Sequence, residues 1–239
     1  MIDPTNYEIG SRLVRPLYSY AEADRLARVT RSTSSRWLKG YKYWYARHSE
    51  DWLLGLEERR VSPPVTPREP DAKYGVSFVD LMEVAAIGRL REKGFSLKRI
   101  RQINRYCQLV LGTNRPLVTE TFKVRGHDIF VMAGEDYLLN VGAQRGMQAW
   151  DEVLDPFLDT VEYEDKLVRR WWPRGKGEPV VVDPDYGFGL PVVAGTQVRT
   201  EVLAERSRAG EVPEEIAYDF GVEVFQVRAA LRYELPDAA

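Results

Sequence analysis

The chain contains very little cysteine and histidine, with one Cys and two His among 239 residues. The single thiol, Cys107, excludes an internal disulfide framework and fits a reducing compartment. Neither His48 nor His127 has a cysteine, a second histidine or a carboxylate at metal-ligand spacing on a predicted helix. We therefore expect no bound metal and no cofactor.

Long apolar runs are also missing from the sequence. No segment approaches the 18 consecutive apolar residues that a membrane-spanning helix needs. The first ten residues include Asp3 and Glu8, and they lack the basic start and apolar stretch of a signal peptide. The sequence therefore predicts a cytoplasmic protein.

The remaining groups that could carry catalysis have simpler explanations. Cys107 falls on the apolar face of a predicted helix, which favours a core position over a nucleophile. Asp151, Asp155 and Asp159 recur every four residues, as on a solvated helix face. The stretch 183–189 has two glycines but no following Gly-Lys-Ser/Thr, so it indicates a turn more than a phosphate loop. We expect no catalytic residue and no enzymatic activity.

Charge is divided unequally along the chain, although its net value is only −2. Residues 10–48 hold nine basic and two acidic side chains, whereas residues 201–239 hold four arginines and nine carboxylates. Phosphate binding requires local positive potential rather than a positive net charge. A basic N-terminal end and an acidic C-terminal end therefore indicate different partners.

The basic end has the pattern of a helix-turn-helix. Residues 20–27 predict a short helix, Arg28 and Val29 a turn, and Thr30 the N-cap of a second helix that continues to Lys39. Gly40 is suited to ending it. An α-helix has 3.6 residues per turn. With this spacing the inner face of the second helix carries Thr33, Ser34, Trp37 and Leu38.

The outer face of the second helix carries small polar and basic side chains, the types that reach base edges and phosphates in a major groove. These candidate DNA-binding residues are Arg31, Ser32, Ser35, Arg36 and Lys39. The aromatic run 41–45 suits an extended strand or wing, and adds Tyr43 as a candidate. An ordinary helix pair with a solvated basic face would give a similar pattern. The positive surplus and the tyrosine-rich run favour DNA binding.

The first 110 or so residues resemble the winged-helix domain of the MerR-like class. The segment YSYAEADRLARVTRSTSSRWLKGY (18–41) resembles its opening helix-turn-helix, and SFVDLMEVAAIGRLREKGFSLKRIR (77–101) resembles its second helix pair. The resemblance implies a DNA-binding domain over residues 1–115. The proline-rich insert before Ser77 leaves the position of the wing open.

The C-terminal end predicts two short strands, 180–182 and 190–193, and three helices, 200–209, 213–220 and 224–234. It is similar to a small trihelical domain of bacterial antitoxins, with Gln197 at the position where that family usually has arginine. The matching residues are Gly195, Thr196, Val198, Gly210, Pro213, Glu214, Glu215, Ile216, Ala217, Asp219, Ala229, Ala230, Leu231 and Tyr233.

The predicted fold is mainly α-helical with β hairpins. It has an N-terminal winged helix-turn-helix domain (1–115), a β-containing middle or connector (116–178), and a β arm followed by a three-helix domain (179–239). A MerR-like head joined to this tail resembles the VapB-type antitoxins of type II toxin–antitoxin pairs. The resemblance implies two partners, operator DNA and a PIN-like ribonuclease toxin of the VapC type.

A PIN-like active site is an acidic metal-binding cluster, so an antitoxin arginine would replace the charge of the metal there. The candidate toxin-binding residues of the tail are Arg199, Arg206, Phe225, Arg228 and Arg232. We expect Phe225 to point outward from the last helix. The alternative is a one-component MerR-like repressor whose tail only dimerises or senses an effector.

The two tail strands show no third strand within the tail itself. Unpaired strand edges favour pairing with a second copy, so we expect a homodimer or a larger assembly with the toxin. Trp171 and Trp172, flanked by arginines, fit either an interface or a strand with one tryptophan inward and one against its neighbour. We favour the strand.

Overall fold

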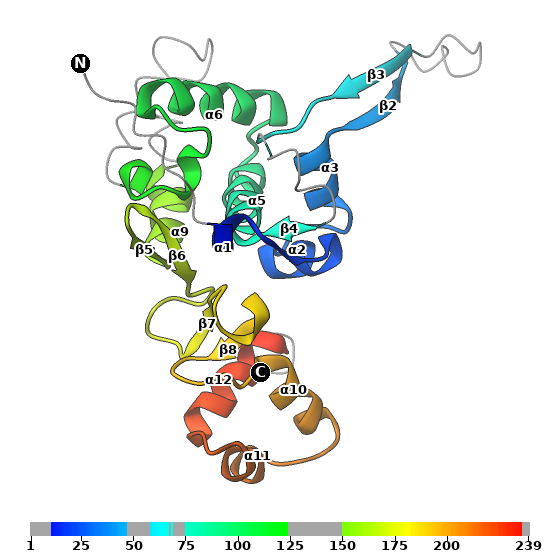
Figure 1. Ribbon diagram of the computed structural model, residues 1–239. Helices are drawn as coiled ribbons and strands as arrows, with labels where there is room; N and C mark the ends of the chain where they lie inside the picture. The colour runs from blue at the N-terminus through cyan, green and yellow to red at the C-terminus, as the bar shows by residue number, and fades with distance from the viewer. Residues whose placement is uncertain (1–10, 47–57, 67, 69–74, 124–149, 236–239) are drawn as a thin grey trace.

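The computed structural model describes residues 11–46, 58–66, 68, 75–123 and 150–235. Most of the described elements are helices, accompanied by two small two-stranded sheets and one four-stranded sheet (Figure 1). A hairpin extends from the N-terminal part, and three helices gather at the opposite end of the molecule (Figure 1). The predicted class, mainly α-helical with β hairpins and a helical domain at each end, is confirmed.

The N-terminal half, which we call the head, contains both two-stranded sheets. Strand β1 pairs with β4 and strand β2 with β3, in each case antiparallel. Its main elements are α1 (Ser11–Val14), β1 (Pro16–Tyr18), α2 (Tyr20–Ala27), α3 (Thr33–Lys39), β2 (Tyr41–Tyr45), β3 (Glu58–Ser62), β4 (Val76–Ser77), α5 (Phe78–Glu92) and α6 (Leu97–Leu111).

Local capping residues set the ends of the long head helices. The hydroxyl of Ser77 accepts from the backbone N–H of Asp80, which begins α5, and Ser96 caps α6 in the same way. Gly112 ends α6 in the left-handed conformation. These boundaries depend on residues within three or four positions, so a sequence pattern is enough to find them.

Helix α5 is the centre of the head. It packs against α1, α2, α3 and α6, and buries nearly its whole circumference. A helix covered on all sides normally carries only apolar residues. Helix α5 nevertheless holds two fully buried carboxylates, Asp80 and Glu83, which require cationic partners.

Two arginines from distant segments neutralise this acidic pair. Arg68 pairs with Asp80 at 2.9 Å, and Arg115 pairs with Asp80 at 2.9 Å and with Glu83 at 2.7 Å. Arg68 also donates to the Tyr20 hydroxyl at 2.9 Å. Removing one member of such a cluster leaves an uncompensated buried charge, so the cluster fixes the chain before β4 and after α6 against the core.

The C-terminal half adds a sheet and three packed helices. The sheet has the order β5-β6-β7-β8, with each neighbouring pair antiparallel. The elements are η2 (Pro116–Val118), η4 (Trp150–Leu154), α9 (Asp155–Asp159), β5 (Val161–Glu164), β6 (Leu167–Trp171), β7 (Val180–Val182), η5 (Gly187–Gly189), β8 (Pro191–Val193), α10 (Thr200–Arg208), α11 (Pro213–Phe220) and α12 (Val224–Glu234).

The tail strands pair with a strand that lies outside the tail, so the inference that their edges are unpaired is wrong. Strand β7 pairs with β6 through Trp171 and Val182, and Val192 forms a bridge to Arg199 beside β8. The pairing with β6 joins segments 116–178 and 179–239, a long-range contact that local sequence patterns do not reveal. The strand edges therefore give no argument for a homodimer.

Much of the described part of residues 150–171 belongs to the same apolar core as the head. Phe157, Leu158 and Val168 are buried in that core, together with Val182 of β7. Trp171 is buried and donates its indole N–H to the hydroxyl of Thr160. The half-buried Trp172 donates to Glu162 on the neighbouring strand, as expected for the strand interpretation.

The three tail helices form a small core of their own. Leu203, Ile216 and Val227 are fully buried there, and Phe220 and Leu231 are partly buried. Pro213 begins α11 and Gly221 ends it with φ of 62°, as predicted. Phe225 is 61% exposed, so its predicted outward position is confirmed.

Two polar contacts join the tail to the head. The buried Tyr18 hydroxyl donates to the carbonyl oxygen of Gly189 at 2.7 Å. Arg25 of α2 pairs with Glu234 of α12 at 3.2 Å, and Glu234 also accepts from the hydroxyl of Thr200 at 2.6 Å. The last tail helix is therefore attached to the first helix of the predicted DNA-binding motif.

The acidic pair on α5 predicts a stability that depends on pH. Burial raises the pKa of Glu83 to about 7, and Asp80 adds to the rise, although Arg115 opposes it. Burial alone would also raise the pKa of Asp80, but Arg115 and Arg68 together lower it. Between pH 4.5 and 7 the folded chain thus holds a proton on Glu83 that the unfolded chain releases.

We expect the contribution of Glu83 to the free energy of unfolding to fall as pH rises through this interval, by on the order of 1–3 kcal/mol, and to level off above it. Urea unfolding of the native chain and of the Glu83→Gln variant from pH 5 to 8 measures this contribution as the difference in slope. Glu205→Gln, at an exposed position on α10, is the control and should retain the native slope. Equal slopes in all three proteins would contradict the assignment.

Candidate nucleic-acid interface

A carboxylate from the preceding helix fixes the start of helix α3. Asp24 of α2 is buried, and its two oxygens accept from the backbone N–H groups of Ser32 at 2.6 Å and Ser34 at 2.7 Å. A charged acceptor for two free N–H groups is a strong helix cap. It holds the turn between α2 and α3 in one geometry.

This cap corrects the predicted N-cap at Thr30. The hydroxyl of Thr30 lies 2.8 Å from that of Thr33, and helix α3 begins at Thr33, after Ser32 in the left-handed conformation. Arg31 and Ser32 therefore belong to the turn rather than to the helix. The sequence could not show this because the capping side chain is eight and ten residues away from the N–H groups that it binds.

The two faces of α3 separate as predicted. Ser34, Trp37 and Leu38 are buried, whereas Arg36 and Lys39 are exposed. Arg31 and Ser32 are exposed in the turn, and Ser35 is half-buried. The guanidinium of Arg36 lies 4.8 Å from the ring centroid of Tyr41, and the ammonium of Lys39 lies 4.2 Å from that of Tyr20. Arg36 thus lies beside the first residue of β2, and Lys39 lies beside the first residue of α2.

Strands β2 and β3 form the wing, whose position in the chain the sequence left open. The register aligns Tyr43 with Arg60, and Trp44 with Arg59. Because side chains alternate across a strand, Tyr43, Tyr45 and Arg60 lie on one face, with the Arg60 guanidinium 3.7 Å from the Tyr45 ring centroid. The wing therefore precedes the proline-rich stretch and extends from the head (Figure 1).

The other face of the wing combines two cations with two exposed apolar side chains. Trp44 is 57% exposed and Val61 is 65% exposed, and the register places them with Lys42 and Arg59. Cationic and aromatic side chains together suit contact with phosphates, sugars and bases. Sequence reasoning missed Trp44, Arg59 and Arg60 as candidates. Two consecutive arginines just before the prolines were the available signal.

Helix α6 holds the base of the wing. Arg101 donates to the Ser62 hydroxyl at 2.8 Å and to the carbonyl oxygen of Pro64 at 3.1 Å. The backbone N–H of Val65 donates to the carbonyl oxygen of Trp37 at 2.8 Å. These bonds connect the end of the wing both to α6 and to α3, so α3 and the wing keep a fixed position relative to each other.

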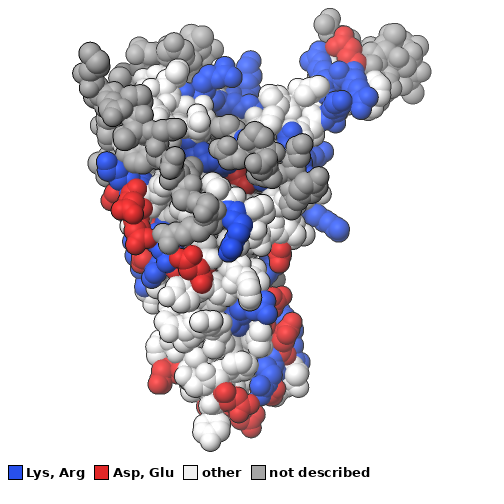
Figure 2. Space-filling model, viewed as in Figure 1, with Lys and Arg blue, Asp and Glu red and all other residues white. Residues whose placement is uncertain are grey.

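The surface charge agrees with this arrangement. Figure 2 shows basic side chains over the wing and above α6, whereas the end of the molecule with the three packed helices mixes basic and acidic side chains. Attraction for a polyanion depends on such local clustering. On the face that Figure 2 shows, basic side chains thus cluster on the wing and over α6.

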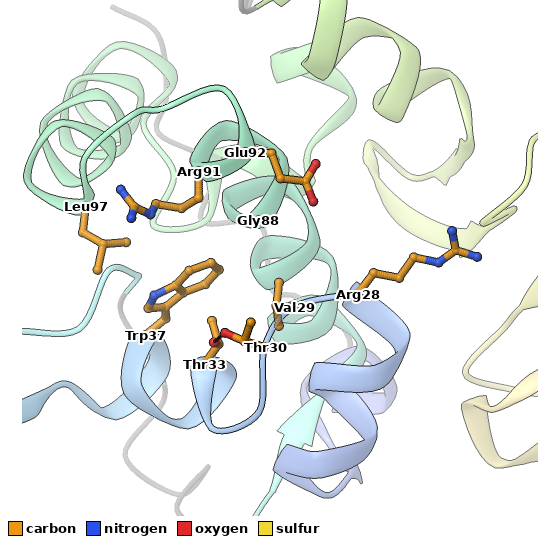
Figure 3. Close-up of a pocket in the computed structure, with 9 residues that line it drawn as sticks. All are labelled: Arg28, Val29, Thr30, Thr33, Trp37, Gly88, Arg91, Glu92 and Leu97. Atoms are coloured by element: carbon orange, nitrogen blue, oxygen red, sulfur yellow. Dashed lines mark hydrogen bonds between the residues drawn. The ribbon is translucent and has the colours of Figure 1, made fainter. Parts of the chain in front are cut away.

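A hollow of about 390 Å³ lies behind this surface, where α3 meets α5 and α6 (Figure 3). Trp37 and Leu97 line one side, and Arg91 and Glu92 lie at its edge (Figure 3). On the opposite side a Cβ at Gly88 would come within 2.9 Å of a Val29 methyl carbon, so glycine allows the turn to approach α5 closely. The hollow is large enough for a small organic molecule.

Most of the tail candidates are engaged within the chain. Arg206 pairs with Glu211 and Asp219, Arg228 with Glu214, and Arg232 with Glu178. Arg199 is exposed, and the structure gives it no carboxylate partner among the residues it describes. The four candidate arginines of the tail are therefore not equivalent, and among them Arg199 is the one without a carboxylate partner in the described part of the chain.

The described residues give little support for metal binding or for nucleophilic catalysis. No group of three or more His, Cys, Asp or Glu side chains that could hold a metal occurs among them. Cys107 is buried, and burial raises the pKa of its thiol to about 12, which leaves it protonated and unreactive. His48 and His127 lie outside the described residues. Among the described helices, none is both long enough and apolar enough to cross a bilayer.

Comparison with known families assigns the two ends of the chain separately. The family described as "Putative DNA-binding HTH domain" matches residues 16–103. The family described as "Protein of unknown function (DUF433)" matches residues 180–233. The first match contains α2, α3 and the wing, and the second contains the strands β7 and β8 with the three tail helices.

Two proteins of Mycobacterium tuberculosis strain H37Rv are similar over nearly the whole chain. One, named "Putative antitoxin VapB45", is 26% identical, covering 94% of this chain and 96% of the relative. The other, named "Uncharacterized protein Rv2308", is 24% identical, covering 94% and 92%. The crystal structure of Rv2018 from Mycobacterium tuberculosis has the same fold, with a TM-score of 0.69, 22% identity, and coverage of 91% of this chain and 98% of that one.

The chain is thus a distant homologue of a protein named as an antitoxin, with a helix-turn-helix domain of the DNA-binding type in its head and a second domain in its tail. These findings support a DNA-binding or antitoxin role. They assign no individual residues, so the DNA-contacting side chains remain predictions from the geometry.

The exposed arginines Arg31, in the turn before α3, and Arg36, in the last turn of α3, give the most direct test of the interface. Arg36→Ala should weaken specific operator binding by ~1–3 kcal/mol if it reads a base, and should weaken binding to all sequences similarly if it contacts a phosphate. The double variant Arg31→Ala/Arg36→Ala should lose more. Fluorescence anisotropy with the upstream operator and a scrambled duplex measures both effects.

The control for charge is Arg174→Ala/Arg208→Ala, which removes two exposed arginines outside α3 and the wing. Its affinity should stay close to that of the native chain. Unchanged operator affinity in the Arg31/Arg36 variant would refute the assignment of this surface.

Proposed function

We propose that this chain is the antitoxin of a type II toxin–antitoxin module. Its head binds the operator of its own operon, and its tail binds and neutralises a PIN-like ribonuclease toxin. The protein is a regulator rather than an enzyme. It acts in the cytoplasm by binding operator DNA and by binding the toxin.

One observation carries the proposal: the similarity to a protein named as an antitoxin extends through head and tail alike, over 94% of this chain. A shared DNA-binding head alone would be compatible with many kinds of regulator. The charge division adds support, because the acidic tail helices are poorly suited to a polyanion and well suited to a protein partner.

The geometry gives the head a consistent mode of binding. The cap by Asp24 fixes the turn that presents Arg31 and Ser32, and Arg101 fixes the wing relative to α6. Helix α3 would enter the major groove with Ser35, Arg36 and Lys39, while Tyr43 and the wing contact the flanking backbone. The same proposal holds that the head is a winged helix of the MerR-like class.

A small-molecule-responsive repressor is the second candidate, favoured by the hollow beside Trp37. A ligand there would contact α3 and α5 together and would change how the recognition helix sits on the core. The sequence-based alternative placed effector sensing in the tail, whereas this hollow lies in the head. In that case the chain would need no toxin partner.

The toxin that the proposal requires is a PIN-like ribonuclease encoded beside this chain's gene, and neutralisation of that nuclease separates the two candidates. We expect the full-length chain to abolish RNA cleavage by that nuclease near equimolar ratio and also to shift a duplex of the upstream operator. The measurement is a time course of cleavage of a labelled RNA at increasing chain concentration, with heat-denatured chain as the control. Full nuclease activity in excess chain that still binds the operator would favour the repressor instead.

The oligomeric state is a separate prediction, and it now rests only on operator symmetry. Two heads on a two-fold operator require two chains. Light scattering should give twice the 27.5 kDa chain mass, either in free solution or on operator DNA. A single chain mass at micromolar concentration in both conditions would exclude the dimer.

A further inference from the structure

The loop between β7 and β8 holds a phenylalanine in a conformation that this residue rarely adopts. Gly187, Phe188 and Gly189 all have positive φ, at 55°, 59° and 78°. For a bulky side chain the left-handed region is strained, and such strain persists only where the surroundings impose it. Phe188 is nevertheless 82% exposed, so packing in the core does not explain the strain.

Both neighbours of Phe188 must be glycine for this loop to form. A Cβ at Gly187 would lie 2.4 Å from a Val192 methyl carbon, and one at Gly189 would lie 2.6 Å from the Tyr18 hydroxyl oxygen. The backbone therefore passes too close to β8 and to the head for any other residue. This close approach pushes the side chain of Phe188 outward.

The loop is also fastened at both ends. At its start the buried carboxylate of Asp183 pairs with Arg169 at 2.6 Å, and Arg169 pairs with Asp185 at 2.9 Å. At its end the Tyr18 hydroxyl donates to Gly189. An exposed aromatic on a rigid support loses little conformational entropy when a partner covers it.

Two arginines flank the exposed ring. Arg15, which follows α1, and Arg199, which precedes α10, line a hollow of about 370 Å³ together with Phe188 and Gln197. Asp185 also lines this hollow, but its carboxylate pairs with Arg169 at 2.9 Å. The structure gives neither Arg15 nor Arg199 a carboxylate partner among the residues that it describes. Gln197 occupies the position where the similar tail domains usually have arginine. Arg199, two residues further along the chain, provides a cation at the same hollow.

We propose that Phe188, Arg199 and Arg15 form the docking surface for the toxin, with the aromatic ring as the anchor and the two guanidinium groups facing carboxylates of the partner. The inference rests on the proposed function and places toxin binding at the junction of tail and head. Exposed aromatic and arginine side chains are the residue types that dominate binding energy at protein interfaces. An acidic partner surface complements both free cations.

This assignment selects among the tail candidates. Arg206, Arg228 and Arg232 would have to give up ion pairs within the chain before binding a partner. Arg199 gives up no such pair. Phe225 is exposed on α12, but its backbone is ordinary helix and shows no strain that a function would explain.

The test uses the full-length chain and an inactive form of the nuclease encoded beside its gene. Asparagine adopts the left-handed conformation more readily than phenylalanine, so Phe188→Asn should leave the thermal midpoint unchanged or raised. The same variant should lower nuclease affinity tenfold or more. Arg199→Ala should lower it to a similar extent and should weaken the dependence of affinity on salt concentration.

The matched controls are Phe225→Ala and Arg228→Ala on α12, which should stay within threefold of native affinity, and operator binding should be unchanged in all four variants. Wild-type affinity in both Phe188→Asn and Arg199→Ala would overturn the surface while leaving the proposed function intact. No binding of the nuclease by the native chain would overturn both.

Discussion

The structure depends on the neutralisation of two carboxylates in the middle of its core. Asp80 and Glu83 sit on the fully enclosed helix α5, and their cations come from Arg68, on the segment after the wing, and Arg115, after α6. A buried charge without a partner is strongly destabilising, so these contacts leave the two segments little freedom. Arg68 extends the constraint to α2 through the Tyr20 hydroxyl.

The positions of α3 and the wing depend on this arrangement. Helix α2 packs on α5 and carries Asp24, whose carboxylate begins α3. The wing ends at Ser62, where Arg101 holds it, shortly before the segment that carries Arg68. Helix α3 is short, and its defined position comes from a set of buried polar contacts rather than from its own helical propensity.

Local features of this fold could be predicted from the sequence, and non-local ones could not. The caps at Ser77 and Ser96 and the turn at Gly221 depend on neighbouring residues, and each is found where the pattern places it. The start of α3 was misplaced because Asp24 acts across the turn. The pairing of β7 with β6 was missed because Trp171 and Val182 are separated by a connector with no strand pattern.

The candidate sites divide in the same way. The inner and outer faces of α3 follow from helical spacing, and so does the exposure of Phe225. Periodicity carries no information about ion pairs, so it could not separate Arg199 from the paired arginines of the tail. The Gly-Phe-Gly sequence at 187–189 offered a signal for a left-handed turn, but its exposed ring depends on close approach to Val192 and Tyr18.

Contacts between the tail and the head connect the two proposed binding surfaces, which are the loop with Phe188 and the surface of α3 and the wing. Tyr18 contacts the loop that presents Phe188, and two residues later α2 begins, the helix that supports α3. Arg25 of α2 pairs with Glu234 of α12. A partner bound at the loop would therefore rest on elements that also position the recognition helix, without touching the DNA-facing residues themselves.

The central claim is that head and tail serve different partners, and hydrogen–deuterium exchange on the full-length chain tests it most directly. The account predicts that operator DNA protects residues 31–45 and 58–62, whereas the nuclease protects residues 183–199. Each partner should leave the direct contact region of the other near its free exchange rate. Protection of helices α10 to α12 by operator DNA, with α3 and the wing unchanged, would contradict the account.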